Sequence, residues 1–355
     1  MDALDSLYWV FKSKNPVQLP DAELDTSEFM ATNQAELYTG AADDAQTVTL
    51  SFVGDILRTH RANVAKDEVY AQVADLLFQS DISVANYESP VTTQPLIDEV
   101  IGDSGPPTEC ASEEQFEALT SHHAQYFDVL NLANNHILDM GAEGLETTLK
   151  ALKKRNILQI GIHEDRTKPL GVKIIERKGI TFGFASCTFG TNGHSLPDDH
   201  AQNVIVANLS SKHEAPDTSL LKEQITEAKK MGCDLVVAVI HWGHEFELFP
   251  RREQQEAAQE LAEFGADIIV CHHPHVAQPI ELYRTKTQHR IVPIAYSLGS
   301  LLWGYTHEAI ASSIVLQISV RKSSGDAKIT DVEVTPIRWH AYENGDQVFQ
   351  RVERR

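Results

Sequence analysis

Clusters of His, Asp, Glu and Asn recur along this 355-residue sequence, each directly after a short apolar run. In FDVLNLANNHILDMG (127–141), apolar residues are followed by two amides, an imidazole and a carboxylate within six positions. A buried strand cannot carry that many polar groups without partners. Either these residues form a capped turn into the next helix, or they point together at a ligand.

Similar clusters follow four other apolar runs. Ligands of α/β proteins bind outside the carboxyl ends of the strands, so five clusters in this position are expected to converge on one site. Any one of these clusters, taken alone, is more commonly a turn or a packed polar group. A further interpretation, besides a capped turn and a ligand site, is that the polar groups only hydrogen-bond one another. The five clusters together favour a site. They are Asp55; Asn86 and Glu88; Asn135 and His136; His241, His244 and Glu245; and His272, His273 and His275.

The residue types in these clusters indicate a metal centre. Imidazole, carboxylate and amide ligands suit borderline to hard divalent ions such as Zn, Mn or Fe. A pair of such ions about 3.5–4 Å apart is a common device for hydrolysing phosphate esters. In HHPH (272–275), a proline stiffens the turn between two imidazoles. Cys271 is expected to point into the sheet and not to bind, and His122 and His123 are interpreted as surface residues of a polar helical stretch.

Strands and helices must alternate to position these clusters, which is typical of an α/β fold. The segments 313–320 and 329–337 flank a turn and predict a hairpin. Helical patterns cover 64–79, 143–155, 218–231 and 251–265. The other predicted strands are 47–53, 81–85, 127–133, 180–187, 234–240, 267–271 and 292–297.

Composition excludes several classes of protein. The formal net charge of −21 argues against a protein that binds nucleic acid by neutralising phosphates. No apolar run approaches the length of a membrane span, and the N-terminus lacks the basic region of a signal peptide, so we expect a cytoplasmic protein. Four cysteines without CxxC spacing predict free thiols. Residues 1–46, with nine acidic residues against two lysines, are predicted to be an acidic extension that precedes one domain, 47–355.

Six stretches within about 47–303 resemble the motif series of the CapA family of capsule synthesis and poly-γ-glutamate biosynthesis. They are FVGDI, NYESP, NLANNHILDMGAEGLETTL, IHWGHEFE, GADIIVCHHPHVAQPIE and YSLGS. That family is part of the calcineurin-like metallophosphoesterase superfamily. The resemblance implies the superfamily fold, a two-sheet β-sandwich flanked by helices in four αββα layers.

The resemblance also implies a role for each matching residue. His136 would donate a proton to the leaving group, with Asp139 orienting its ring. The implied metal ligands of a dinuclear site are Asp55, Glu88, Asn135, His241, His273 and His275, with Glu88 bridging. The residues implied to support these ligands or to contact substrate are Asn86, Asn192, His244, Glu245, His272 and Ser300.

Three positions depart from the superfamily pattern. Leu57 stands where the superfamily has a histidine, and Glu88 stands where it has an aspartate, although CapA proteins share both features. Ser300 replaces an amide in the YSLGN pattern. The first two departures leave open whether both metal positions are filled, and the third is expected to alter a hydrogen bond to a ligand.

Two functions fit these observations. The leading hypothesis is a CapA-like, metal-dependent hydrolase that resembles phosphoesterases, with a metal-bridging hydroxide as nucleophile and His136 as general acid. The alternative is a non-catalytic accessory protein that binds polymer in a capsule or polyglutamate synthesis or export system. The expected partners are an anionic polymer or a small phosphoester, together with synthesis proteins. Because the chain is acidic, metal and local basic residues would have to hold a polymer; candidates are Arg58, Arg61, Arg251 and Arg252.

Overall fold

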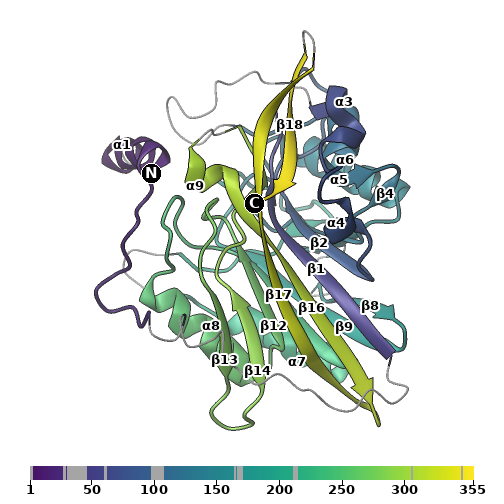
Figure 1. Cartoon of the computed structure of the whole chain (residues 1–355), viewed down its shortest axis with the longest axis vertical. Helices are drawn as coiled ribbons and strands as arrows, with labels where there is room; N and C mark the ends of the chain where they lie inside the picture. The colour runs from purple at the N-terminus through teal and green to yellow at the C-terminus, as the bar shows by residue number, and fades with distance from the viewer. Residues whose placement is uncertain are drawn as a thin grey trace.

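In a computed structural model, two β-sheets lie face to face and helices cover both outer faces (Figure 1). The predicted four-layer αββα arrangement is therefore confirmed. The residues that the structure describes are 3–26, 29, 46–59, 62–96, 108–163, 165, 171–210, 215–304, 307–344 and 347–355.

The first sheet has four parallel strands at its centre and one end, and a long antiparallel extension at the other. Its order is β18-β17-β16-β1-β2-β5-β6, and β15 pairs with the end of β1. The strands are β1 (Gln46–Ile56), β2 (Ile82–Tyr87), β5 (Val129–Asn131), β6 (Leu158–Ile160), β15 (Ser300–Leu302), β16 (Ser312–Ser323), β17 (Asp326–Asn344) and β18 (Gln347–Arg354). The predicted hairpin is confirmed as β16 and β17, which pair antiparallel.

The second sheet has the order β13-β14-β12-β11-β9-β8, with four parallel inner strands and an antiparallel strand at each edge. Its strands are β8 (Lys173–Arg177), β9 (Ile180–Thr188), β11 (Leu235–His241), β12 (Ile268–His272), β13 (Ile280–Arg284) and β14 (Ile291–Ala295). Two small pairs, β3 (Ser121–His122) with β4 (Gln125–Tyr126) and β7 (Ile162–His163) with β10 (Asn203–Val204), lie outside both sheets.

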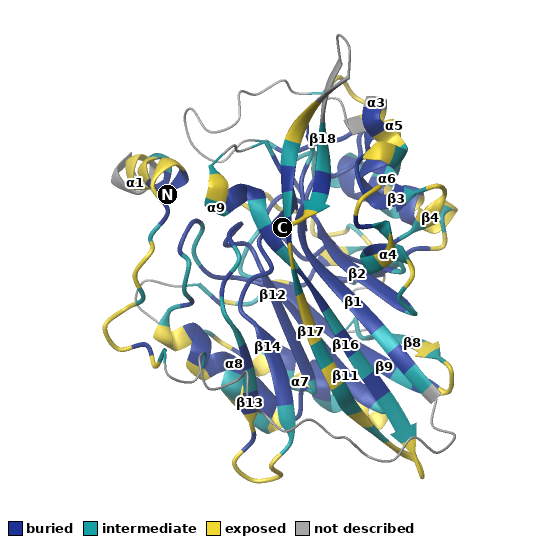
Figure 2. Ribbon diagram, in the orientation of Figure 1, coloured by how far each residue is buried: buried dark blue, intermediate teal, exposed yellow. Residues whose placement is uncertain are grey.

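Strand periodicity divides the core into layers. In β11, Val237 and Val239 face the other sheet, whereas Val236, Ala238 and Ile240 face the helices, as expected when alternate side chains point to opposite faces. Both sheets contribute to the apolar layer between them, which is dark blue at the centre of Figure 2. The sandwich is thus closed by apolar contact along most of its length.

Helices cover the two outer faces. The first sheet is covered by α3 (Ala62–Ala65), α4 (Ala74–Phe78), α5 (Glu113–Thr120) and α6 (Gly141–Lys154), and the second by α7 (Ser219–Lys230) and α8 (Arg252–Phe264). The remaining elements are α1 (Ala3–Lys14), the 3₁₀ turn η2 (Lys66–Glu68) and α9 (Glu308–Ala311). Within the described ranges, no helix has both the length and the apolar character that crossing a membrane requires.

Two local predictions are wrong. The predicted helix 64–79 is broken, because the carbonyl of Val69 accepts a hydrogen bond of 2.8 Å from the backbone of Val352 in β18 instead of continuing a helix. His122 belongs to a short strand and not to a helix, and its ring stacks on Phe78 with 6.3 Å between centroids, whereas His123 is exposed, as predicted. In both places a distant partner decides the local conformation.

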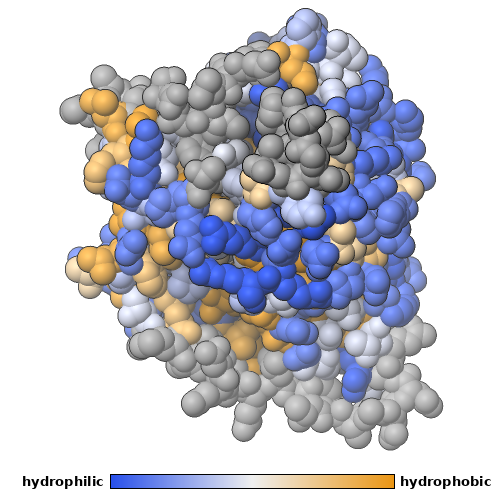
Figure 3. Space-filling model, turned by 45° about the horizontal axis from the view of Figure 1, so that its top comes forward, coloured by the Kyte–Doolittle hydropathy of each residue, from blue (hydrophilic) through white to orange (hydrophobic). Residues whose placement is uncertain are grey.

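The described N-terminal residues pack on the sandwich beside α9 (Figure 1). On the face shown in Figure 3, hydrophilic side chains gather across the middle and hydrophobic ones lie along the left edge. The division into an extension, 1–46, and a domain, 47–355, stays a prediction.

Candidate metal centre

The candidate site lies between the two sheets, beyond the end of the apolar layer. In β2 and β5, Val84 and Val129 face the other sheet, so the residues two positions later, Asn86 and Asn131, point the same way. In the second sheet the same alternation carries His241 at the end of β11 to this face. The polar side chains therefore occupy the carboxyl end of the inter-sheet layer, where the strands stop contributing apolar residues.

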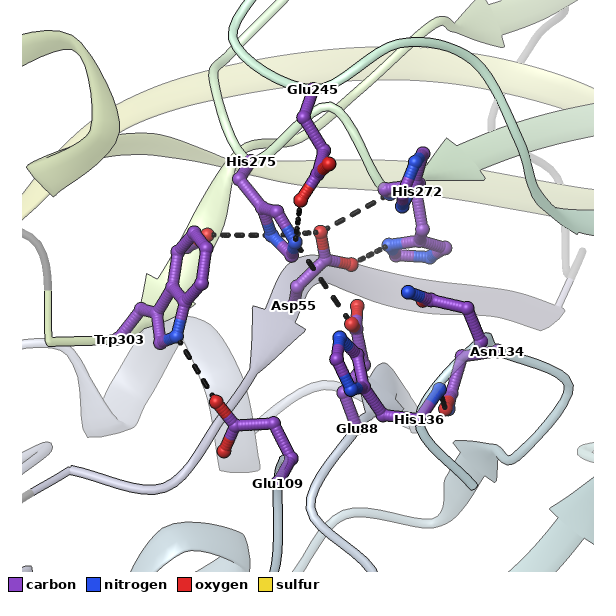
Figure 4. A network of polar contacts seen from close by, with 12 residues as sticks. Asp55, Glu88, Glu109, Asn134, His136, Glu245, His272, His275 and Trp303 are labelled. Carbon is purple, nitrogen blue, oxygen red and sulfur yellow. Dashed lines mark hydrogen bonds and ion pairs between the residues drawn. The ribbon is translucent and has the colours of Figure 1, made fainter. Parts of the chain in front are cut away.

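Asp55 lies at the centre of the site, fully buried (Figure 4). Its Oδ1 is 3.0 Å from Nδ1 of His272, and its Oδ2 is 3.1 Å from Nδ1 of His275. Burial alone would raise the pKa of Asp55, but these two imidazoles hold it well below its usual value. Gly54 makes this placement possible: a Cβ there would lie 1.9 Å from the carbonyl oxygen of Gly299.

Asn86 connects the residues around Asp55. Its Nδ2 is 2.8 Å from Oδ1 of Asp55, 2.6 Å from Oε1 of Glu88 and 3.2 Å from Nδ1 of His241. An amide nitrogen carries two hydrogens, so it cannot donate to all three atoms. Asp55, Glu88 and His241 also offer ligand atoms within 4.8 Å of one another, which is an arrangement that suits a cation.

The pKa values of Glu88, His241 and His273 shift in the direction that favours the neutral form of each group. Burial, together with the neighbouring Asp55 carboxylate, raises the pKa of Glu88 well above its usual value. Burial lowers the pKa of His241 and of His273, so both imidazoles are neutral and keep a lone pair for a ligand.

Several buried atoms of the site have no hydrogen-bond partner. They include Oε2 of Glu88, Nδ1 of His273 and Nε2 of His275. Buried polar atoms are normally paired, so a cluster of orphaned ligand atoms supports the fit of a divalent ion. His273 and His275 both adopt left-handed backbone conformations, with φ of 99° and 56°, which are uncommon for residues other than glycine.

His136 forms a pair with Asp139 at the edge of this group. Nδ1 of His136 is 2.7 Å from Oδ2 of Asp139, which also accepts a hydrogen bond of 2.8 Å from the backbone N–H of Glu109. Burial would lower the pKa of His136, but the bond to Asp139 and its charge raise it above the usual value. Asp139 does not also cap the following helix, because the N-cap of α6 is Met140 and no side-chain cap bond is made there.

The amides of the 127–141 segment have distinct contacts. Asn135 lies between His241, whose Nε2 is 2.8 Å from its Oδ1, and Asn192, whose Oδ1 accepts a bond of 3.2 Å from its Nδ2. Asn134 donates to the carbonyl of Tyr87 at 2.8 Å and accepts from the backbone of His136 at 3.2 Å. Asn134 therefore holds the turn that presents its two neighbours.

Other predicted residues lie around this centre. Ser300 has its Oγ 3.1 Å from Nδ1 of His275, and Glu245 has its Oε1 4.0 Å from Nε2 of the same ring. Burial raises the pKa of Glu245. His244 lies in the same loop as Glu245 and is half-buried. Cys271 is buried in the core on the helix side of its sheet.

The structure also brings in residues that the sequence reasoning missed. Asn131 donates to Oδ1 of Asn86 at 2.9 Å and accepts from Ser186 of the second sheet at 2.7 Å, which links the sheets. An asparagine within an apolar strand was an available signal for this. Glu109 accepts from Ser89 at 3.1 Å and from the indole of Trp303 at 3.4 Å, and it stands in no motif.

Leu57 fills an apolar cluster beside the site. It is fully buried and packs with Trp9, Phe246 and Trp303. Trp303 also lies against the ring of His275, with 4.3 Å between centroids. The position at which the resemblance implied a histidine is therefore apolar in its surroundings as well as in its residue type.

Comparison with known proteins identifies the family of this chain. The profile of the family described as bacterial capsule synthesis protein PGA_cap matches residues 49–305. The chain belongs to this PGA_cap family. The match spans all of the predicted site residues, and the resemblance inferred from the motifs is confirmed.

Several bacterial proteins are similar to this chain over most of its length. The chain is 29% identical over 320 residues to the PGA biosynthesis protein CapA of Bacillus subtilis, covering 88% of this chain and 77% of that protein. It is 31% identical over 284 residues to the capsule biosynthesis protein CapA of Bacillus anthracis, covering 78% and 64%. A probable polyglutamine synthesis accessory protein of Mycobacterium tuberculosis is 25% identical, with 73% and 66% covered.

Solved structures with a similar arrangement include a phosphatase of Mycoplasma pneumoniae and a calcineurin-like phosphoesterase of Bacillus subtilis. The first has a TM-score of 0.49 at 12% identity and covers 82% of this chain and 94% of its own. The second has a TM-score of 0.45 at 13% identity and covers 82% and 90%.

Proposed function

We propose that this member of the PGA_cap family is a metal-dependent hydrolase that acts in poly-γ-glutamate or capsule synthesis. One observation carries the proposal: Asp55, Glu88 and His241 offer ligand atoms within 4.8 Å of one another, all buried. Asn135, His273 and His275 would complete the ligand set. The mixture of oxygen and imidazole nitrogen atoms favours Zn, Mn or Fe over Mg or Ca.

A divalent ion bound there would act as a Lewis acid and supply an acidic water as the nucleophile. The protein's own residues prepare the remaining steps. Asp55, with its lowered pKa, is ionised at neutral pH, while neutral His241 and His273 keep their lone pairs available. The dry surroundings strengthen every electrostatic interaction among them.

His136 is proposed as the general acid. Its Nδ1 is engaged by Asp139, which leaves Nε2 to give its proton to the leaving-group oxygen as the bond to phosphorus breaks. The raised pKa favours the protonated ring that this role requires, and Asp139 stabilises its charge. Asn192, whose Nδ2 is 3.4 Å from Nδ1 of His136, lies close enough to contact a bound substrate.

Metal content and turnover test the proposal together. The purified chain should contain a transition metal by elemental analysis and should hydrolyse bis(p-nitrophenyl) phosphate or a γ-glutamyl peptide. His275→Ala should lose both properties, whereas the control His340→Ala, a surface histidine paired with Glu353, should keep both. A His275→Ala protein with full activity would contradict the assignment of the site.

A second candidate is a non-catalytic accessory protein that binds polymer. The observation in its favour is Leu57, which is buried among apolar rings where a ligand would otherwise stand. Two of the predicted basic contacts are already paired, since Arg251 bonds Glu247 and Arg252 bonds Glu23 and Glu256. Arg61 lies outside the described residues. A metal-free, inert protein that retains polyglutamate on a column would favour this candidate.

A further inference from the structure

The N-terminal helix α1 packs against the loop that carries Glu245, although α1 lies outside the family match. Trp9 is 4% exposed and packs edge-on against Phe246, with 5.4 Å between ring centroids. Both belong to the apolar cluster that contains Leu57 and Trp303. Because Trp303 lies against His275, this cluster connects α1 with the candidate metal centre.

Two side chains on one face of α1 bond the two carboxylates that flank Phe246. The indole N–H of Trp9 donates to Oε2 of Glu245, and Nζ of Lys12 lies 3.0 Å from Oε1 of Glu247. Positions three apart share a helix face, so Trp9 and Lys12 reach the loop together. Both contacts are largely shielded from water, which makes them stronger than surface pairs.

The chain after α1 is bonded to the same loop through its backbone. The N–H of Val17 donates to the carbonyl of Phe246 at 2.8 Å, and the N–H of Leu248 donates to the carbonyl of Val17 at 2.9 Å. Phe246 itself has a left-handed backbone, with φ of 62°. An uncommon backbone conformation persists where its surroundings determine it, and here the N-terminal segment supplies part of those surroundings.

From these contacts we infer that Trp9 is a positioning residue for the metal centre and acts through Glu245. Oε2 of Glu245 is held by Trp9, while Oε1 faces Nε2 of His275, an atom without a hydrogen-bond partner. A carboxylate held in place attracts a cation without a further cost for ordering its side chain. The inference rests on the proposed function, because it assumes that a cation binds beside His275.

Titration of the metal-free, full-length protein with Co²⁺, followed by visible absorption, tests this inference. Trp9→Phe keeps an aromatic six-membered ring and removes the N–H donor together with the rest of the five-membered ring. Trp339→Phe is the matched control, because Trp339 is equally buried in β17 and its indole nitrogen has no hydrogen-bond partner. Glu245→Ala and the double variant with Trp9→Phe complete a cycle, and thermal unfolding checks that every variant is folded.

Trp9→Phe should weaken Co²⁺ binding about 5-fold or more, and Trp339→Phe less than about 2-fold. In the Glu245→Ala background, Trp9→Phe should add less than about 2-fold. The inference is overturned if Trp9→Phe behaves like the control, if its effect persists without Glu245, or if Glu245→Ala leaves affinity unchanged. If the unaltered protein binds no Co²⁺, the proposed function fails as well; if it binds and only the Trp9 effect is missing, the inference alone fails.

Discussion

The two sheets contribute different chemistry to the same site. The first sheet and its loops supply carboxylates and amides, among them Asp55, Asn86 and Glu88, whereas the second supplies the imidazoles of His241, His272 and His273. The ionised Asp55 therefore lies on one side, and the neutral rings of His241 and His273 lie on the other. Neither sheet alone supplies the whole proposed ligand set, so the candidate site exists only where the sheets meet.

Removal of metal should have the largest effect. Dialysis against a chelator should abolish turnover, and Zn²⁺, Mn²⁺ or Fe²⁺ should restore it, whereas Mg²⁺ and Ca²⁺ should not, because imidazole nitrogens disfavour hard ions. Activity assays after each addition provide the measurement. Full restoration by Ca²⁺ would show that the second sheet's imidazoles are not ligands.

Substitution of Asp55, in the first sheet, should have the second-largest effect on turnover. Asp55→Asn removes the negative charge that two imidazoles contact, and turnover should fall about 100-fold or more, with loss of bound metal. The control is Asp234→Asn, a carboxylate paired with Lys322 away from the site, which should change turnover less than about 2-fold. Equal losses of turnover for both variants would show that Asp55 contributes no more than a carboxylate outside the site.

The His136–Asp139 pair predicts a change in pH dependence. Asp139 raises the pKa of His136, so Asp139→Asn should lower it. Because the proposed acid must be protonated, turnover falls as pH rises through that pKa, and in the variant this decline should move to lower pH. Maximal turnover should also fall about 10- to 100-fold. A pH–rate profile with an unmoved alkaline decline would exclude His136 as the acid that Asp139 supports.

The smallest effect concerns stability. Asn134→Ala leaves the buried carbonyl of Tyr87 and the N–H of His136 without their partner, which should cost about 1–3 kcal/mol in the free energy of unfolding. Asn203→Ala, at an exposed position of β10, should cost less than about 0.5 kcal/mol. Denaturant unfolding of both variants measures the difference, and equal values would show that Asn134 does not hold the turn.

Continuous apolar runs, each ended by polar residues, made most of the fold and the site predictable from the sequence. The inner strands are apolar on both faces, and the polar residues at their ends stand out against that background, as at His241 and Asn86. The edge strands β8 and β13 did not stand out, because they are only partly buried and lack a continuous apolar run. Local pattern therefore identified the centre of each sheet better than its edges.

What the sequence did not predict depends on distant partners. The carbonyl of Val69 accepts a hydrogen bond from β18, so the helical pattern around Val69 does not form one helix. Trp9 belongs to a short amphipathic stretch whose docking on Phe246 is set by the folded domain. Glu109 stands in no motif, and it becomes part of the site only through Ser89, Trp303 and the backbone bond to Asp139.

Gly54 has a consequence for how variants of this protein are interpreted. The carbonyl of Gly299 occupies the space that any side chain at position 54 would need. In a library of random substitutions, position 54 should tolerate as little as Asp55, although glycine takes part in no chemistry. A map of intolerant positions would therefore not distinguish a residue required for steric reasons from one required for chemistry. Measurement of metal content in folded variants at positions 54 and 55 would distinguish them.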